Sequence, residues 1–375
     1  SAAPHEQQQQ QQQQQQACYL NVYSAQWERQ CPVPAELSLR GGILAEAMGL
    51  GKTVEVLACI LCNPLSASVE GARLKGSAAE EHARLLRGPW RNPRVECVCG
   101  EYHANPEDAT AYRGLWVCCD MCDAWLHARC VGYTRRPTRR RRGEEEQEQE
   151  SSYICQDCVA RVAASELQGQ SAASLIVCPA PILDQWRSEI ARHVSDSCGL
   201  RVFVYRSMKS LQNERQLKAE DLISAAKLGS YDIVLTTYDD LRMDLHHDIK
   251  SDVHAGDRAF RNRKRYRIFP TPLLNLKWWR VCLDEAQMVE STSTPATQLA
   301  CRLLTRYKWC VTGTPIQRGL EDLYGLLNFL QIEPWCYRKW WLVALQRPYE
   351  ANNQGNLVNV LKPLIWRRMK DDGAE

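Results

Sequence analysis

A glycine-rich segment at residues 48–53 constrains the fold of this chain more than any other feature of the sequence. It reads Met-Gly-Leu-Gly-Lys-Thr and stands between the apolar residues 43–45, which favour a short buried strand, and residues 54–62, which favour a helix. Between a strand and a helix, glycines allow backbone N–H groups to approach phosphate oxygens at the helix N-terminus. The segment therefore predicts a phosphate-binding loop within an α/β fold.

The side chains of this loop suit a nucleotide bound with magnesium. Gly49 and Gly51 leave the backbone open to phosphate. Lys52 is predicted to pair with the β- and γ-phosphates, and the Thr53 hydroxyl to ligate Mg²⁺. Glu46 stands where the usual pattern has its first glycine. Taken alone, the segment is therefore also compatible with a chance Gly-Lys-Thr at the start of a helix.

Two adjacent carboxylates, Asp284 and Glu285, follow an apolar strand predicted at 279–283. A parallel strand delivers such residues to the carboxyl edge of the sheet, where open α/β folds bind ligands. We predict that Asp284 holds Mg²⁺ through water and that Glu285 orients and deprotonates the attacking water. The alternative is a pair of solvated acids at a strand end, and the phosphate-binding loop upstream argues against it.

A third motif, Thr312-Gly313-Thr314-Pro315, follows the strand predicted at 308–312. Alone it would be an ordinary turn. Because it stands behind the other two motifs in chain order, its hydroxyls and tight turn predict a coupling element. We expect Thr312, Gly313 and Thr314 to link the state of the nucleotide to a bound polymer.

Strands and helices alternate through most of the chain, which is typical of a parallel sheet covered by helices on both faces. Residues 65–173 separate the first two strands, too far for a structureless loop in a compact domain, so they predict an inserted module. The predicted strands are 43–45, 174–178, 201–205, 232–236, 279–283 and 308–312, and the predicted helices are 54–62, 181–193, 212–227 and 297–305, with a helical tail over 321–368.

Cysteines and one histidine within the insertion have zinc-ligand spacing. The chain has 18 cysteines, which in a short secreted protein would suggest disulfides. Its length, the histidine and the phosphate-binding loop instead favour reduced thiols inside a cell. Eight ligands suffice for two structural, tetrahedral zinc sites. They are Cys97, Cys99, Cys119, Cys122, His127, Cys130, Cys155 and Cys158, with Cys118 left over.

Charge and hydropathy exclude several classes of protein. The net charge of the 375 residues is only +3, so nucleic-acid binding must come from local patches. The basic segment 258–267 is one candidate, and a basic loop without a function is the alternative. No apolar run approaches the roughly 20 residues of a membrane-spanning helix. The N-terminus, with its glutamine tract at 7–16, has no apolar core of a secretory signal, so we expect no membrane partner.

The motifs, in this order, resemble those of the Swi/Snf-type ATPases of helicase superfamily two. The resemblance implies ATP and Mg²⁺ as cofactors and double-stranded DNA or nucleosomes as partners in the nucleus. It also implies that Gln185, Thr236 and Thr237 contact the DNA backbone. The segments that carry it are 41–53, 175–186, 236–238, 284–287 and 312–317.

This resemblance divides the chain into parts. It implies a RecA-like ATP-binding lobe with a parallel sheet, split into 41–64 and 174–372. A low-complexity segment over 1–40 precedes the lobe. The zinc module over 95–160 interrupts it, joined by linkers at 65–94 and 161–173.

The zinc module itself resembles a PHD finger, in which a tryptophan stands two residues before the ligand histidine, as Trp125 does here. Trp116 and Trp125 could form an aromatic cage for a methylated lysine of a histone tail through cation–π attraction. The alternative is that both rings pack the small core around the metals. The resemblance also implies interleaved ligation, with Cys97, Cys99, His127 and Cys130 on one zinc ion and Cys119, Cys122, Cys155 and Cys158 on the other.

Residues 278–280, 284–290 and 317–323 resemble more closely the eukaryotic Swi/Snf-type ubiquitin ligases that carry histone-linker, PHD and RING modules. That resemblance implies a chromatin translocase within a ligase acting in DNA repair or chromatin, with a ubiquitin-conjugating enzyme as partner if a RING follows. The chain departs from the family's Asp-Glu at Glu46-Ala47 and contains neither a second motor lobe nor a RING. The alternative is therefore a non-enzymatic chromatin reader with a degenerate lobe. Because arginine fingers of a second lobe contribute orders of magnitude to turnover, we expect this chain alone to bind ATP weakly and to hydrolyse it negligibly.

Overall fold

The structure, a computed structural model, describes residues 19–21, 26–28, 39–47, 49–65, 71–86, 92–109, 112–133, 153–167, 170–213, 221–247 and 270–368. The chain divides into two units, Ser1–Leu39 and Arg40–Glu375. In the first unit, β1 (Tyr19–Asn21) and β2 (Gln26–Glu28) form an antiparallel ribbon. The glutamine tract at 7–16 and the basic segment at 258–267 lie outside the described residues.

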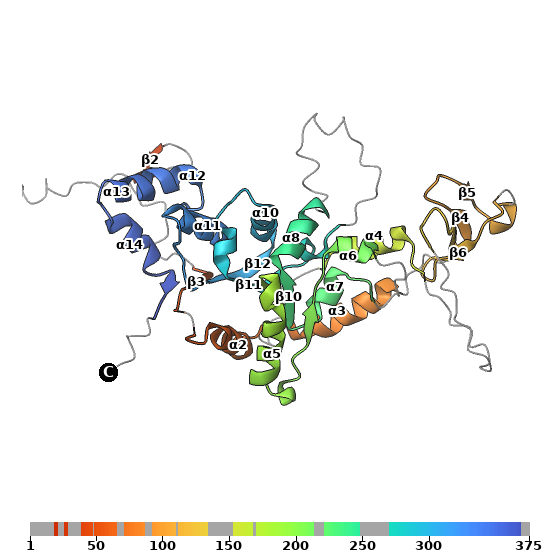
Figure 1. Cartoon of the computed structure of the whole chain (residues 1–375), viewed down its shortest axis with the longest axis horizontal. Helices are drawn as coiled ribbons and strands as arrows, with labels where there is room; N and C mark the ends of the chain where they lie inside the picture. The colour runs from red at the N-terminus through yellow and green to blue at the C-terminus, as the bar shows by residue number, and fades with distance from the viewer. Residues whose placement is uncertain are drawn as a thin grey trace, which may run out of the picture. The chain divides into compact units, whose positions relative to one another are not determined.

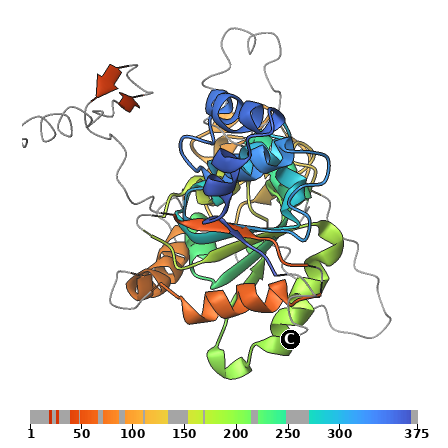
Figure 2. The ribbon, with the colours of Figure 1, turned by 90° about the vertical axis from the view of Figure 1, so that its left-hand side faces the viewer.

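A sheet of seven parallel strands forms the centre of the second unit (Figures 1 and 2). The order across the sheet is β13-β3-β12-β11-β8-β10-β9. All residues of β8 and β10 are buried, as expected for strands covered on both faces. The predicted parallel α/β fold is therefore confirmed. The strands are β3 (Gly41–Leu44), β8 (Ser174–Cys178), β9 (Val202–Val204), β10 (Ile233–Thr237), β11 (Trp278–Asp284), β12 (Thr305–Val311) and β13 (Ile365–Trp366).

Helices cover both faces of this sheet. α2 (Lys52–Cys62) and α5 (Leu183–His193) lie below it in Figure 1, and α8 (Tyr238–Asp244), α10 (Pro295–Arg302) and α11 (Glu321–Leu330) lie above it. The apolar side chains of α2 and α5 recur every three or four residues, so that one side of each helix faces the sheet. They join the strands in one core cluster through Val56, Leu57, Ile60, Leu183, Trp186 and Ile190.

The tail predicted as helical ends in a strand. After α12 (Arg338–Trp340), a π-helical turn (Trp341–Gln346), α13 (Arg347–Glu350) and α14 (Gly355–Leu361), the chain enters β13. Pro363 lacks the N–H group that would continue a helix. Beyond it, β13 pairs in parallel with β3. The helical prediction was therefore wrong at the end of the tail, where an edge strand completes the sheet.

The helix predicted at 212–227 is also wrong in part. The described residues show α6 (Met208–Asn213) and α7 (Ala225–Gly229), and residues 222–224 between them are not helical. The Ser224 hydroxyl accepts from the Lys227 N–H at 2.9 Å. This side-chain cap begins a new helix at Ala225.

The two segments predicted as linkers contain helices. α3 (Gly71–Leu86) lies within 65–94, and its His82 Nδ1 is 2.8 Å from the Ser224 hydroxyl oxygen. Burial lowers the pKa of His82 to about 4. α4 (Gln156–Ala164) extends into the second predicted linker, where the Asn275 side chain donates to the Ala163 carbonyl at 3.1 Å. Both connections are therefore built against the lobe.

The inserted module has its own small sheet, in the order β5-β4-β7-β6. β4 pairs in parallel with β7 and antiparallel with β5, and β7 pairs antiparallel with β6. Over the part of the chain that the structure describes, no helix has the length and apolar character needed to cross a membrane. The strands are β4 (Arg94–Glu96), β5 (Tyr102–His103), β6 (Trp116–Cys118) and β7 (Ala124–His127).

Candidate nucleotide-binding site and metal centres

The phosphate-binding loop has the backbone that an anion site needs. Gly49 and Gly51 have φ angles of 87° and 90°, which L side chains adopt at a cost. A Cβ atom added to either residue would meet no atom within 4 Å. Gly51 is the N-cap of α2, and no side chain caps this helix. The first N–H groups of α2 are therefore available to phosphate oxygens.

Lys52 stands at the first position of α2 and turns back to the strand side of the loop. Its Nζ donates to the carbonyl oxygens of Glu46 at 3.1 Å and Ala47 at 3.4 Å. Thr53, the predicted Mg²⁺ ligand, is half-buried beside it. Because charged acceptors bind an ammonium group more strongly than neutral carbonyls do, Lys52 is suited to exchange these two contacts for phosphate oxygens.

Asp284 is the last residue of β11 and is held from three directions. Its Oδ2 accepts from the indole Nε1 of Trp186 at 2.7 Å, and its Oδ1 accepts from the Glu285 N–H at 2.9 Å. The hydroxyl of Tyr238 donates to its backbone carbonyl at 2.8 Å. Burial raises the pKa of the Asp284 carboxyl, whereas the Trp186 hydrogen bond and the charge of Lys52 oppose this rise.

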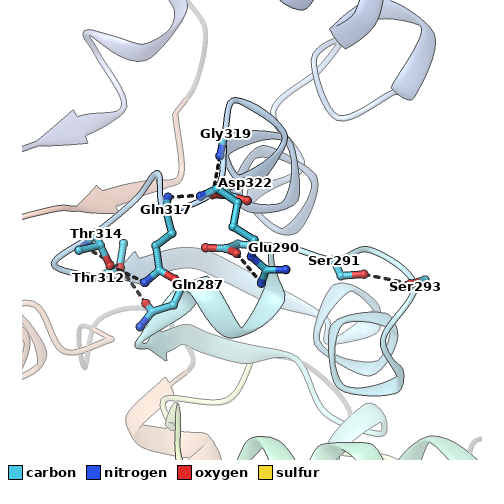
Figure 3. Close-up of polar contacts among 10 residues, drawn as sticks. Gln287, Glu290, Ser291, Ser293, Thr312, Thr314, Gln317, Gly319 and Asp322 are labelled. Carbon is cyan, nitrogen blue, oxygen red and sulfur yellow. Dashed lines mark hydrogen bonds and ion pairs between the residues drawn. The ribbon is translucent and has the colours of Figure 1, made fainter.

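Glu285 is joined to the third motif through a single side chain. It has a left-handed backbone, with φ of 49°, so that the chain turns sharply after the strand. The Gln287 amide donates to Glu285 Oε2 at 2.8 Å. The carbonyl oxygen of the Gln287 side chain accepts from the Thr312 hydroxyl at 2.8 Å (Figure 3). The Thr312 N–H in turn donates to the carbonyl of Leu44 at 3.0 Å, at the end of β3. Three segments far apart in sequence are thereby connected.

The same hydrogen-bond chain continues to the start of α11 (Figure 3). Thr314 N–H donates to the Thr312 hydroxyl at 3.1 Å, and the Gln317 amide donates to the Thr314 hydroxyl at 2.8 Å. The backbone N–H of Gln317 then donates to Asp322 Oδ2 at 2.8 Å. Gly313 lies in the bend between the two threonines. The predicted coupling residues thus lie between the carboxylate Glu285 and a helix on the far side of the sheet from α2.

Of the three predicted DNA contacts, one has an exposed side chain. Gln185 is exposed in the first turn of α5. Thr236 and Thr237 at the end of β10 are 0% and 3% exposed. The Thr237 hydroxyl donates to Asp240 Oδ2 at 2.6 Å and accepts from the Asp240 N–H at 3.1 Å, so it caps α8. A strand-end threonine is as suited to a helix cap as to a phosphate contact, and the sequence does not distinguish the two.

The eight predicted zinc ligands form two clusters, and within each cluster all ligand atoms lie within 4.8 Å of one another. A tetrahedral zinc ion with Zn–S bonds of about 2.3 Å places two sulfurs about 3.8 Å apart. The Sγ atoms of Cys119 and Cys158 are 3.9 Å apart, those of Cys122 and Cys155 3.7 Å, and Cys99 Sγ is 3.5 Å from His127 Nδ1. The residues therefore fit zinc. The clusters are Cys97, Cys99, His127 and Cys130, and Cys119, Cys122, Cys155 and Cys158.

Thiol ionisation in the all-cysteine cluster also favours a cation. Hydrogen bonds from the other three thiols lower the pKa of Cys119, whereas hydrogen bonding to Cys119 raises the pKa of Cys155 and Cys158. Four buried sulfurs this close cannot all be thiolates unless a positive charge compensates them. A divalent ion supplies that charge, which is why such sites couple metal binding to folding.

Side chains around His127 complete the other cluster, that of Cys97, Cys99, His127 and Cys130. With Nδ1 of His127 toward the cysteines, its Nε2 lies 3.2 Å from Glu101 Oε2. Glu101 is therefore near enough to orient the ring, as carboxylates do beside metal-ligating histidines. The rings of Tyr112 and Trp116 lie 3.9 and 4.5 Å from the His127 ring, centroid to centroid. Trp116 therefore packs around the metal cluster, and Trp125 on the neighbouring strand is half-buried.

Several residues of these sites were not predicted. Gln287 was placed within a motif but without a role, and Glu101 and Tyr112 were not singled out. Arg368, at the end of the lobe, has a side chain that pairs with Glu46. The position of Glu101 in the sequence does not predict its contact with His127, because the residue beside a metal ligand can come from any segment that the fold brings next to it. An exposed charge at a chain end is likewise common in any sequence.

The fold and the sites define a class of protein: a nucleotide-binding α/β lobe with a phosphate-binding loop, interrupted by a finger that can hold two metal ions. The family model described as the SNF2-related domain matches residues 7–374. The chain belongs to this family of helicase-like ATPases.

The chain is similar to several individual proteins. E3 ubiquitin-protein ligase SHPRH of Homo sapiens is 39% identical over 280 residues, which cover 74% of this chain and 15% of that protein. DNA repair protein RAD5A of Arabidopsis thaliana is 28% identical over 356 residues, covering 94% of this chain and 26% of that protein. The solved SWI2/SNF2 ATPase core of Sulfolobus solfataricus in complex with dsDNA is 18% identical, with a TM-score of 0.44, and the match covers 89% of this chain and 41% of that chain. The chain spans about a quarter or less of the two curated relatives.

Proposed function

We propose that this chain is the ATP-binding lobe of a DNA-dependent, Swi/Snf-type chromatin translocase. The complete protein is proposed to be a nuclear RING ubiquitin ligase that acts in DNA repair or chromatin. Its similarity to a protein named as an E3 ubiquitin ligase and to one named as a DNA repair protein supports this assignment. The ubiquitin-conjugating enzyme and the nucleosome belong to the complete protein as partners.

The observation that carries the proposal is the hydrogen-bond chain from Glu285 through Gln287 to Thr312. It connects a carboxylate at the carboxyl edge of the sheet with a loop that continues into α11. A nucleotide site that only stored ATP would gain nothing from such a link. In a motor, by contrast, the position of the carboxylate must depend on a second bound partner.

Each residue then has a proposed task. Gly49, Gly51 and Lys52 hold the phosphates, and Thr53 and Asp284 hold Mg²⁺, which when bound neutralises charge on the transferring phosphoryl group. Glu285 orients the attacking water and accepts its proton.

Substitution at two positions tests these assignments. Calorimetric titration of the 375-residue chain with Mg²⁺·ADP should show binding that Lys52→Ala weakens by about a hundredfold, since a charge-assisted contact to phosphate is lost. Glu285→Gln should retain binding, because its proposed role is in hydrolysis. In the complete protein, both changes should abolish DNA-stimulated ATPase activity. Turnover that survives either change would contradict the site, and a complete protein without any ATPase activity would favour the non-enzymatic reader.

For the DNA contact we retain Gln185, whose side chain is exposed. Contacts to the phosphate backbone position the polymer without reading its sequence. Gln185→Ala should therefore weaken binding of the complete protein to DNA of different sequences by the same factor. A loss confined to one sequence would contradict this role.

The finger is proposed to hold two structural zinc ions and to contact a histone tail. Because Trp116 packs on the metal cluster, we assign it to the core and keep Trp125 as the candidate ring for the tail. Titration of the wild-type chain and of Trp125→Ala with methylated and unmodified histone-tail peptides tests this role of Trp125. If neither peptide binds the wild-type chain, the finger has no such role.

A further inference from the structure

The end of the lobe lies directly against the strand that leads into the phosphate-binding loop. Three backbone N–H groups of that strand and its extension donate to the chain around β13. Ile43 donates to the carbonyl of Leu364 at 2.8 Å, and Ala45 donates to that of Trp366 at 2.7 Å. Beyond the strand, Ala47 donates to the carbonyl of Arg368 at 3.3 Å. The segment 364–368, called the exit segment below, therefore runs beside the loop up to its first residues.

The Arg368 side chain continues this contact with charge. Its Nε pairs with the carboxylate of Glu46, and its Nη2 pairs with that of Glu55 in the first turn of α2. The side chain of Glu46 is completely buried, whereas that of Arg368 is half exposed. One guanidinium group thus bridges two acids that flank the phosphate-binding loop on its strand side and its helix side.

Glu46 needs this partner. A buried carboxylate without a compensating charge is costly, and beside a phosphate site it would also repel the ligand. The hydrogen bond from Arg368 lowers the pKa of Glu46, so the group is ionised. Its second oxygen, Oε2, is buried and has no hydrogen-bond partner among the described residues. Arg368 is therefore the charge that neutralises this acid in the structure.

The backbone of the same residues holds Lys52. The Lys52 ammonium group donates to the carbonyls of Glu46 and Ala47, while Arg368 holds the Glu46 carboxylate and the Ala47 N–H from the other side. The two cations thus share one dipeptide. If the exit segment moves away from β3, Glu46 loses its charged partner and the backbone of Glu46 and Ala47, which holds Lys52, loses a support.

We propose that Arg368 is a positioning residue for the nucleotide site, which neutralises Glu46, also contacts Glu55 and thereby couples seating of the exit segment to nucleotide binding. This inference rests on the proposed nucleotide site and extends it to the end of the lobe. Such coupling is reciprocal: the factor by which the seated segment strengthens nucleotide binding is the factor by which nucleotide strengthens seating. Whatever follows Arg368 in a longer protein would then sense nucleotide through this contact.

Calorimetric titration of the 375-residue chain with Mg²⁺·ADP tests the electrostatic part. Arg368→Ala should raise the Kd by about tenfold, a typical size for coupling between sites. The double variant Arg368→Ala/Glu46→Gln should recover most of this loss, because the acid that required neutralisation is gone. Lys362→Ala, which removes an exposed positive charge near the same end of the chain, is the matched control and should not change the Kd. Circular dichroism of each variant establishes that the lobe is folded, and Arg368→Gln replaces Arg368→Ala if the latter does not fold.

Hydrogen exchange tests the reciprocal part. The amides of Ala45 and Ala47 donate to the exit segment, so saturating Mg²⁺·ADP should slow their exchange in the wild-type chain by about the same tenfold factor. In Arg368→Ala this extra protection should be absent.

The outcomes separate the two ideas. If the wild-type chain binds Mg²⁺·ADP and Arg368→Ala binds it equally well, the role of Arg368 is refuted and the nucleotide site stands. A double variant that stays as weak as Arg368→Ala would also overturn the inference, because the arginine would then act through packing rather than charge. Absence of binding in the wild-type chain would refute the nucleotide site and, with it, the coupling.

Discussion

The finger and the lobe build their sites in opposite ways. Each cluster of possible metal ligands comes from a segment of 40 residues or fewer, 97–130 for one and 119–158 for the other, at short spacings such as Cys119-x-x-Cys122. The nucleotide site instead collects Lys52 from the start of α2, Asp284 from the end of β11 and Thr312 from the residue after β12, which are brought together only by the parallel sheet. The difference teaches that a metal site can be specified by local spacing, whereas a strand-edge site requires the whole sheet to be folded first. The two regions should therefore respond to different perturbations.

Removal of zinc should have the largest effect and should be confined to the finger. Because structural zinc sites contribute about 10–16 kcal/mol of apparent binding free energy, chelation or Cys119→Ser should unfold residues 95–160. Hydrogen exchange would show rapid labelling there and unchanged protection in the lobe strands.

Cys118→Ser provides the matched control for that experiment. Cys118 neighbours the ligand Cys119 but belongs to neither cluster, so this variant should retain zinc and protection. If Cys118→Ser unfolds the finger as much as Cys119→Ser does, or if the finger keeps its protection from exchange after chelation, zinc does not stabilise the finger in the way proposed.

The lobe should instead respond to pH through a buried acid. Asp244 accepts hydrogen bonds from the hydroxyls of Tyr205 and Thr271 and from the Met208 N–H, and burial raises its pKa to about 6. The unfolded chain has an ordinary value of about 4, so the folded state binds the proton more tightly. This contribution to stability is fully present below about pH 4 and is lost as the pH rises through about 6.

The size of this loss is about 3 kcal/mol, from roughly two pKa units at about 1.4 kcal/mol each. Urea unfolding at a series of pH values between 4 and 7 gives the free energy of unfolding at each pH. Between these limits the free energy of the wild-type chain should fall by this amount relative to that of Asp244→Asn, which has no acid to titrate at this position. An identical change in the two proteins would show that Asp244 does not titrate in this range.

A smaller effect should follow from Trp186→Phe. The change keeps an aromatic ring in the core but removes the N–H group that donates to the buried Asp284 carboxylate. Hydrogen bonds to charged groups contribute about 1.5–3 kcal/mol, so the free energy of unfolding should fall by about 2 kcal/mol. Trp309→Phe, in a tryptophan that packs against the same core cluster, measures the cost of the smaller ring. A loss no greater than that of this control would mean that the hydrogen bond does not stabilise the lobe.

The features that the sequence predicted correctly are those that depend on local pattern. The two clusters of cysteines and histidine, the buried strand 174–178 and the position of the carboxylates 284–285 at a strand end were all predicted from local pattern. The helix predicted at 212–227 was wrong in part, because the Ser224 cap begins a new helix at Ala225. The segment predicted as a linker at 65–94 contains α3, whose His82 contacts Ser224. Thr237 was assigned to DNA, but its hydroxyl caps α8. In each of these cases the structure depends on a contact that the local sequence pattern does not show: a side-chain cap or a contact with a residue far away in the sequence.

The sequence by itself determined a parallel α/β lobe, a glycine-rich loop between its first strand and helix, and an inserted finger with two clusters of possible metal ligands. Periodicity, glycine placement and ligand spacing are local properties, and they fix these features whatever surrounds them. Only the tertiary structure decided that Trp186 supports Asp284, that Gln287 joins Glu285 to Thr312, and that Arg368 neutralises Glu46. Those contacts depend on the order of the strands and on the pairing of the edge strand β13 with β3. A buried charge or donor needs a partner, and the folded arrangement of the strands decides which residue is close enough to be that partner.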